Sequence, residues 1–538
     1  MVFARRSTTL LAAIIASCAM VLSLTACTSD NKTVVDGQTT VTSNSAGGVA
    51  VFTPSDGITL NQQTPLNKWA KLVPDLAKAL ADAGFKKGDI DHTTSDSLAK
   101  QSRAIQDFVV DHLSNNTTDD SGIAIAPDNM TLLVAPVVEA DASTRQYGDY
   151  ISQNLSTNDA TDGGATSDGE SSKDDSSNTE SDSTASDEQA QAVDRLVSSL
   201  KLAKESGMHV VLLGNSIEGY KPDAFVKFSD AQTIGKLQAE KMVSKLKLDK
   251  ASKDNPKYIE VLLPYTAVDE KGNANDSTFA QEAFRGIWQV LGSYYQKGVV
   301  ESPSGTLDGK STENDWQAVA YDAAKEGSTA KVLDKRLAKT DGQSTLTRID
   351  GIITMNDYIA SEVVKELDDL GYTGSAADIN PQITISGIVG NITGKKDLSR
   401  DAVPDPIKSP ENDNANDSSS SDDDADEDTS ASDKDRNSQW PLVTGYGAYV
   451  SNIPSIVNGK QWMTGMEDRQ TIATDIAQAC AKLNKDEALN SMPSIRNSEV
   501  GGVKKIPTIS EPLLAVSASN LKSALIDPGY ISLADAGL

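Results

Sequence analysis

The sequence is poor in the residues that carry metal, redox and nucleophilic chemistry. It has three cysteines and three histidines in 538 residues. Cys18 and Cys27 lie near the N-terminus, so only Cys480 is left for the folded part, without a second thiol for a disulfide. We expect Cys480 to be buried and inert, because no histidine lies near it in sequence. With no nucleophile elbow, histidine cluster or phosphate-binding glycine loop, the sequence argues against an enzyme and predicts neither cofactor nor metal.

Basic residues are also in short supply. The chain has 49 Lys and Arg against 77 Asp and Glu, a net charge of −28. Nucleic-acid phosphates need a basic surface, so we exclude nucleic acid as a partner. Two acidic tracts, residues 159–188 and 409–435, bury too little apolar surface to offset the entropy of ordering, and we predict that both are disordered insertions. A calcium loop in the first tract is the alternative, but the spacing of its oxygen ligands does not match.

Only one stretch is long and apolar enough to enter a bilayer, and it lies at the start of the chain. Arg5 and Arg6 precede an apolar run over residues 9–24, which ends in Leu-Thr-Ala-Cys at Cys27. This order is typical of a secretory signal, and the small residues before Cys27 resemble a bacterial lipoprotein lipobox. We predict a signal peptide over 1–26, a lipid on Cys27, a flexible tether over 27–48, and a location on the outer face of a cell membrane. An ordinary signal peptide and an anchor helix are the alternatives.

The rest of the chain alternates short apolar runs with helical patterns, which predicts a doubly wound parallel α/β fold. Residues 440–470 show the alternation best: a strand, a loop at Gly445-Tyr446-Gly447, a short helix, a second strand, and a helix that opens at Asp468. Ligands of open α/β sheets bind at the carboxyl ends of the strands. The loop around Tyr446 is therefore a candidate binding site.

Several local patterns, in this order along the chain, resemble the type 1 periplasmic sugar-binding proteins of ABC importers, in the xylose-binding and multiple-sugar-binding branch. The matching features are a Lys-Trp pair at the start of the first helix, a helix that opens with Asp and continues Gly-x-Leu-Gln-Ala-Glu, a Trp after a later strand, an Asn-Asp strand exit, and a Val-Thr-Gly strand. They fall at Lys68-Trp69, Asp230 with 235–240, Trp316, Asn356-Asp357 and 443–445.

The resemblance implies two Rossmann-like lobes with parallel sheets, joined by a three-crossing hinge. The first lobe would comprise residues 49–228 and 447–492, and the second 229–446 and 493–538. A mono- or oligosaccharide would bind between the lobes, and the closed form would dock on permease subunits. The alternative is a sugar-sensing or surface-interaction protein that kept the fold and lost transport.

The resemblance also implies a ligand-binding set. Trp69 and Trp316 would stack on the sugar, and polar groups would hold its hydroxyls. The full predicted set is Lys68, Trp69, Asn215, Asp230, Trp316, Asn356, Asp357 and Tyr446. Helical spacing also allows Trp69 to be a core residue, and Asn356-Asp357 to be a helix cap.

The sequence departs from the family at the places that hold the sugar. Gly214-Asn215 replaces an Asp-Arg pair, Gly445-Tyr446-Gly447 lacks the family's carboxylate, Glu467 replaces a Lys, and Ser277-Thr278 replaces an Asn pair. Each lost partner of a buried polar group costs about 1–3 kcal/mol. We therefore expect a ligand that differs from the family's monosaccharide, with Tyr446 as one substitute contact.

Overall fold

The computed structural model describes residues 34–35, 38–39, 46–55, 65–115, 129–138, 144–151, 153–156, 180–268, 275–338, 346–377 and 437–538. Residues 1–45 form a separate unit, described only at the antiparallel strands β1 (Val34–Val35) and β2 (Gln38–Thr39). The predicted signal peptide and Cys27 lie outside the described residues. No helix within the described ranges combines the length and the apolarity needed to cross a membrane.

The first sheet has seven strands, and all pairings are parallel except the one at its edge between β17 and β18. Successive side chains along each strand point to opposite faces of the sheet, so the two faces bury different sets of apolar side chains. In spatial order the strands are β17 (Ile495–Val500), β18 (Val503–Ser510), β9 (Ala224–Lys227), β7 (His209–Leu213), β5 (Met130–Val134), β3 (Gly48–Pro54) and β4 (Ile90–Ser95).

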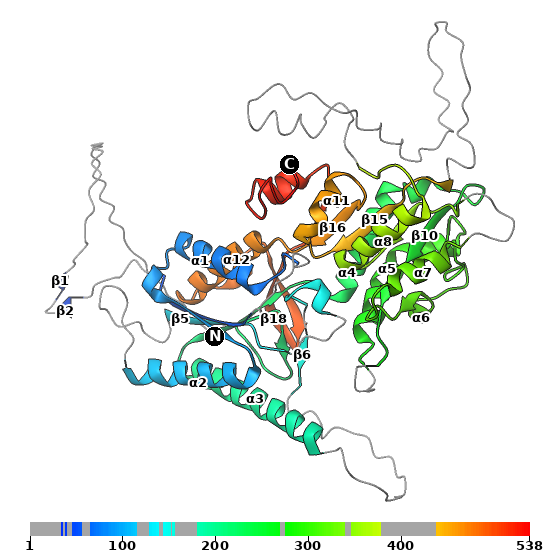
Figure 1. The fold of residues 1–538 in the computed structure, drawn as a ribbon. Coiled ribbons are helices and arrows are strands. Elements are labelled where there is room, and N and C mark those ends of the chain that lie inside the picture. The colour runs from blue at the N-terminus through cyan, green and yellow to red at the C-terminus, as the bar shows by residue number, and fades with distance from the viewer. Residues whose placement is uncertain are drawn as a thin grey trace, which may run out of the picture. The chain divides into compact units, whose positions relative to one another are not determined.

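Two pairs of helices cover this sheet, one pair on each face (Figure 1). The first pair is α1 (Trp69–Asp82) and α12 (Arg469–Leu483), and the second is α2 (Leu98–Asn115) and α3 (Glu180–Glu205). Helix α3 begins inside the range 159–188 that we predicted as disordered. Residues 157–179 and the whole of 409–435 lie outside the described part of the chain.

The second sheet has six strands, all parallel except the last pair. Helices α4 (Ala231–Lys245) and α5 (Thr278–Gln296) pack on one face, and α7 (Ser328–Arg336) and α8 (Asp357–Leu370) on the other. The strands in order are β12 (Val300–Glu301), β10 (Lys257–Val261), β14 (Gly351–Ile353), β15 (Leu442–Tyr446), β16 (Met463–Met466) and β19 (Leu514–Ser517).

Shorter elements complete the two lobes. Strand β6 (Asn154–Leu155) pairs with β8 (Ser216–Ile217), and β11 (Leu263–Pro264) with β13 (Ala320–Tyr321). The short helices are η1 (Lys87–Asp89), η3 (Arg145–Tyr147), η5 (Leu248–Lys250), α6 (Trp316–Val319), η6 (Val450–Asn452), α11 (Ile453–Val457), η7 (Leu489–Ser491) and η8 (Lys522–Ile526).

Within the described ranges the chain passes between the two sheets three times, but two of the crossings differ from the predicted boundaries. The first lies between β9 and α4, as expected. The second follows β16 at Glu467, not Tyr446, because β16 pairs with β15 and β19 in the second sheet. The third lies at residues 511–513, not 492–493, because β17 and β18 extend the first sheet through β9. Pairing partners far apart in sequence decide these two positions.

Candidate functional site

Glu467 lies where the first and second crossings meet. One carboxylate oxygen accepts hydrogen bonds from the Ser229 backbone N–H (2.7 Å), the Ser229 hydroxyl, and the Tyr446 hydroxyl at 3.4 Å. Burial raises the pKa of Glu467 to about 7, although the bonds from Ser229 and Tyr446 oppose that shift. Tyr446, predicted as a sugar contact, is 1% exposed. Its hydroxyl therefore ties the second sheet to the first crossing.

Asp357, at the start of α8, is fully buried and organises the end of β15. Its carboxylate accepts from the Tyr449 backbone N–H (2.9 Å), the Gln461 side chain (2.7 Å) and the Thr464 hydroxyl (2.9 Å). Burial raises the pKa of Asp357 to about 6, against the effect of these bonds. All of these partners belong to the second lobe, so Asp357 holds the loop after β15 in place.

Asn356 caps α8 and also contacts the other lobe. Its Oδ1 accepts from the Ile359 backbone N–H at 2.9 Å, as the cap alternative anticipated. Its Nδ2 donates to Gln146 Oε1 at 3.1 Å. Gln146 belongs to a segment, residues 144–151, that follows the first-lobe strand β5. A residue of the protein itself thus contacts the amide that was expected to hold a sugar hydroxyl.

Lys68 and Trp69 make contacts within the first lobe. Lys68 Nζ lies 2.7 Å from Asp149 Oδ1, and the Trp69 backbone N–H donates to Asp149 Oδ2 at 3.0 Å. The Trp69 ring is 3% exposed and packs edge-on against Tyr150 and Phe228, with centroids 5.1 and 5.8 Å away. Trp69 is therefore a core residue in this structure, which was the alternative that its helical spacing allowed.

Asn215 and Trp316 are also engaged internally. Asn215 accepts from the Gln153 backbone N–H at 2.9 Å and donates to the Pro136 carbonyl at 2.9 Å, so it joins two loops of the first lobe. Trp316 is 9% exposed and packs edge-on against Tyr265 in the core of the second lobe. Its helix, predicted around 316–324, ends at Val319 because the next residues pair as a strand with β11.

A cavity of about 460 Å³, which we call the outer cavity, lies between the lobes beside Asp230. Asp230 caps α4 through the Thr233 N–H (2.8 Å) and pairs with Lys227 Nζ at 2.9 Å. The amide side chains of Gln153 and Gln232 have no hydrogen-bond partner in the described part of the chain. From the first lobe the lining residues include Thr144, Ile151, Gln153 and Asn154, and from the second Asp230, Gln232, Asp276, Thr278, Phe279 and Glu282.

Of the predicted set, only Asp230 lines the outer cavity. Sequence reasoning did not single out Gln146, Tyr147 or Gln153, which come from the stretch after β5 that we read as a detour of the chain. The available signal was the pair of aromatics, Tyr147 and Tyr150, in an otherwise polar segment. Aromatic residues in such a segment indicate packing, but not the surface against which they pack.

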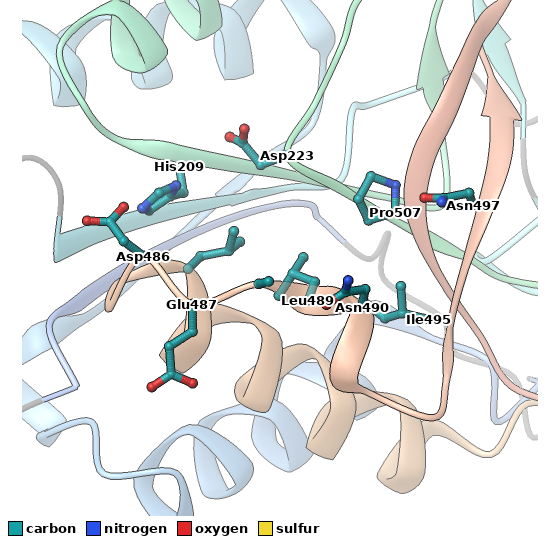
Figure 2. A pocket seen from close by; sticks show the side chains of 11 residues that line it. His209, Asp223, Asp486, Glu487, Leu489, Asn490, Ile495, Asn497 and Pro507 are labelled. Carbon is teal, nitrogen blue, oxygen red and sulfur yellow. The ribbon is translucent and has the colours of Figure 1, made fainter. Parts of the chain in front are cut away.

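A second cavity, of about 500 Å³, lies at the amino ends of strands β7 and β9 in the first sheet (Figure 2). His209 and Asp223 line it from the amino ends of β7 and β9, and Asp486, Glu487 and residues near η7 from the other side. The pairs Asp223–Lys204 (2.8 Å) and Glu487–Lys482 (2.9 Å) already neutralise two of its carboxylates. All of its lining residues belong to the first lobe, so this cavity does not lie between the lobes. Within the described ranges, no group of three or more His, Cys, Asp or Glu is placed to hold a metal ion.

No family model and no curated protein matches this chain. Among solved structures, it is similar to an ABC transporter solute-binding protein from Clostridium phytofermentans with bound β-D-glucose, at 17% identity over 91% of this chain and 99% of that chain, with a TM-score of 0.43. A carbohydrate transporter solute-binding protein from Chloroflexus aurantiacus in complex with D-glucose matches at 18% identity over 91% and 98%, with a TM-score of 0.43.

A periplasmic ribose ABC transporter protein from Conexibacter woesei matches at 14% identity over 90% of this chain and 96% of that chain, with a TM-score of 0.41. The assignment of the fold rests on the strand order of the two sheets and on the crossings between them. Those features confirm the predicted fold class: two Rossmann-like lobes with parallel sheets, joined by a three-crossing hinge.

Proposed function

We propose that this protein is a lipid-anchored solute-binding protein that captures a sugar between its lobes and delivers it to the permease subunits of an ABC importer. The observation that supports the proposal is the outer cavity, which both lobes line beside the first crossing. A solute there touches both lobes at once, so its binding energy favours the closed arrangement. Incorporation of labelled palmitate, with loss of the label in Cys27→Ala, tests the anchor on the outer face of the membrane.

The chemistry of the outer cavity suits a neutral, polyhydroxylated solute. Planar amides and carboxylates hydrogen-bond pairs of neighbouring hydroxyls, and the Phe279 ring offers an apolar face of the kind that packs on a sugar ring. No Lys or Arg is among its described lining residues, and the nearby Lys227 and Arg285 are already paired with Asp230 and Glu282, so a solute phosphate or carboxylate would find no unpaired cation among these residues. In this proposal Gln153, Gln232 and Phe279 join Asp230 as ligand contacts. Lys68, Trp69, Asn215, Trp316, Asn356, Asp357 and Tyr446 hold the surrounding lobes in shape.

A thermal-shift screen of the full chain against neutral mono- and oligosaccharides tests this function. A ligand at one hundred times its Kd stabilises the folded state by about 2.7 kcal/mol, so a specific sugar raises the melting temperature. The double variant Gln153→Ala/Gln232→Ala should lose that response. Asn490→Ala, which changes the second cavity instead, should keep it. No response to any sugar would contradict the proposal.

A sensing or surface-interaction protein is the second candidate, and one observation favours it. Gln146 and Tyr147 fill the inner part of the space between the lobes, so the residues expected to hold a transported sugar face the protein itself. Binding of the sugar-loaded protein to the permease subunits of an ABC importer separates the two candidates. A sugar-dependent thermal shift without sugar-dependent permease binding would favour sensing.

A further inference from the structure

The segment formed by residues 144–151 is fastened to the first lobe at Gly148 and Asp149. The Asp149 backbone N–H donates to the Asn67 carbonyl at 2.8 Å, and the Asp149 side chain binds Lys68 and the first N–H of α1. Gly148 has φ +101, and a Cβ there would lie 2.6 Å from the Asn67 carbonyl oxygen, so only glycine allows this approach. The segment therefore turns sharply next to α1, at a position set by the first lobe.

Gln146 and Tyr147 of the same segment contact the second lobe. Tyr147 is 1% exposed and belongs to the hydrophobic core beside α4 and α5. Its ring lies 4.7 Å from Phe279 and 6.2 Å from Tyr446, measured between centroids. The Tyr449 hydroxyl donates to the Gln146 carbonyl at 2.6 Å, and Asn356 Nδ2 donates to Gln146 Oε1 at 3.1 Å. The Tyr147 ring thus packs against aromatic rings of the second lobe, and two oxygen atoms of Gln146 accept hydrogen bonds from that lobe.

These contacts have the chemistry expected for a bound solute. The Tyr147 ring packs against aromatic rings. Two oxygen atoms of Gln146 accept hydrogen bonds, one from the α8 cap residue Asn356 and one from Tyr449 in the loop after β15. We propose that Gln146 and Tyr147 form an internal plug, which occupies the inner part of the space between the lobes and holds the lobes together without a solute. The inner polar residues become accessible only when the plug leaves.

The plug is also connected to the wall of the outer cavity. Thr144 and Ile151, at the two ends of the plug segment, line that cavity, and so does Phe279, which contacts the Tyr147 ring. Movement of the plug therefore changes the outer cavity, and a solute there contacts the segment that must move. The plug itself rests on contacts between protein groups, so its test needs no solute and is independent of the proposed function.

Hydrogen-exchange mass spectrometry on the full chain tests the plug. In Gln146→Ala/Tyr147→Ala the backbone amides of 144–151 and 447–452 should exchange about tenfold faster, because loss of the Tyr147 ring and the Gln146 amide releases the segment, and with it the backbone carbonyl that accepts from Tyr449. Amides of the first-lobe strands β5 and β7 should keep their wild-type rates. Equal exchange at 447–452 in variant and wild type would overturn the proposal.

A milder matched pair guards against general unfolding of the double variant. Tyr449→Phe removes a hydroxyl that donates to a carbonyl across the lobes, whereas Tyr372→Phe removes a hydroxyl that donates to the Thr347 carbonyl within the second lobe. Tyr449→Phe should speed exchange at 144–151 and Tyr372→Phe should not. If both variants, or neither of them, changed exchange at 144–151, the plug would be excluded.

Discussion

Glu467 is a buried carboxyl at the meeting point of two crossings, and its titration affects the whole molecule. Its pKa lies at about 7 against an ordinary value of 4.5, because burial disfavours the charged form. The neutral form is therefore favoured by folding. This contribution is complete below about pH 4.5 and is lost as the pH rises through about 7.

We predict that Glu467→Gln reduces the dependence of stability on pH. The raised pKa corresponds to a loss on the order of 3 kcal/mol between pH 4.5 and 8, which glutamine, being neutral, avoids. Melting temperatures measured from pH 5 to 8 should fall less steeply in the variant. Part of the slope remains, because Asp357 titrates near pH 6 with the same sign. The exposed variant Glu487→Gln should retain the wild-type slope, and an unchanged slope in Glu467→Gln would contradict the prediction.

Asp357 should tolerate substitution poorly because its buried carboxylate accepts several hydrogen bonds. In Asp357→Asn an amide NH₂ replaces one of the oxygens that accept from Tyr449, Gln461 and Thr464, so at least one buried donor loses its acceptor. We expect a loss of about 1–3 kcal/mol in the free energy of unfolding, measured by urea denaturation. Asp368→Asn, which removes an exposed ion pair with Lys460, should cost less than about 1 kcal/mol. Similar losses in the two variants would show that Asp357 is not an organising residue.

At the scale of elements, α4 and α5 pack closely against each other at two glycines. Gly235 and Gly286 face the partner helix: a Cβ on Gly235 would lie 2.2 Å from the Ala283 carbonyl oxygen, and one on Gly286 would lie 2.0 Å from that of Gln232. Both obstacles are backbone atoms, which cannot move without shifting a helix. These glycines therefore set the distance between the helices that open toward the outer cavity.

We predict that Gly286→Ala destabilises the protein despite a gain in helix propensity. Alanine is favoured over glycine inside a helix by about 1 kcal/mol. Overpacking at a backbone contact costs about 1–3 kcal/mol, so the net change should be a loss. Gly309→Ala is the control, because its Cβ would meet no atom closer than 3.4 Å. Urea denaturation distinguishes them, and a stabilised Gly286→Ala would show that the helices can separate freely.

At the scale of the whole molecule, charge should select among solutes. The net charge is −28, and the outer cavity contains Asp230, Asp276 and Glu282. We predict that a sugar which stabilises the protein loses its effect when it carries a phosphate, because the anion must approach these carboxylates while the nearby cations, Lys227 and Arg285, are already paired with Asp230 and Glu282. Thermal shifts with matched neutral and phosphorylated sugars measure this. Asp276→Asn should narrow the difference, and equal responses to both sugars would contradict the prediction.

The large elements could be predicted because each leaves a local signature. The run at 209–213 matches β7, the predicted helix from Asp230 to Leu246 matches α4, and the predicted helix from Asp468 to Leu483 matches α12, each within a residue. Asp at the N-cap marks the start of both helices. The apolar run 383–389 predicts a further strand, either separate from Leu442–Thr444 or one interrupted strand with it, and this run lies outside the described residues. In the tail, the apolar pattern predicts one strand over 508–516, but the structure has two, because they pair in different sheets.

By itself, the sequence determined the doubly wound pattern and the caps at Asp230, Asn356 and Asp468, because these depend on periodicity and on neighbours within one turn, whereas the two lobes were implied by the family resemblance. Only the tertiary structure decided where the second and third crossings lie and what fills the space between the lobes. Gln146 meets Asn356 from 210 positions away. No local pattern specifies such a contact, because it depends on how two separately folded sheets bring their loops together.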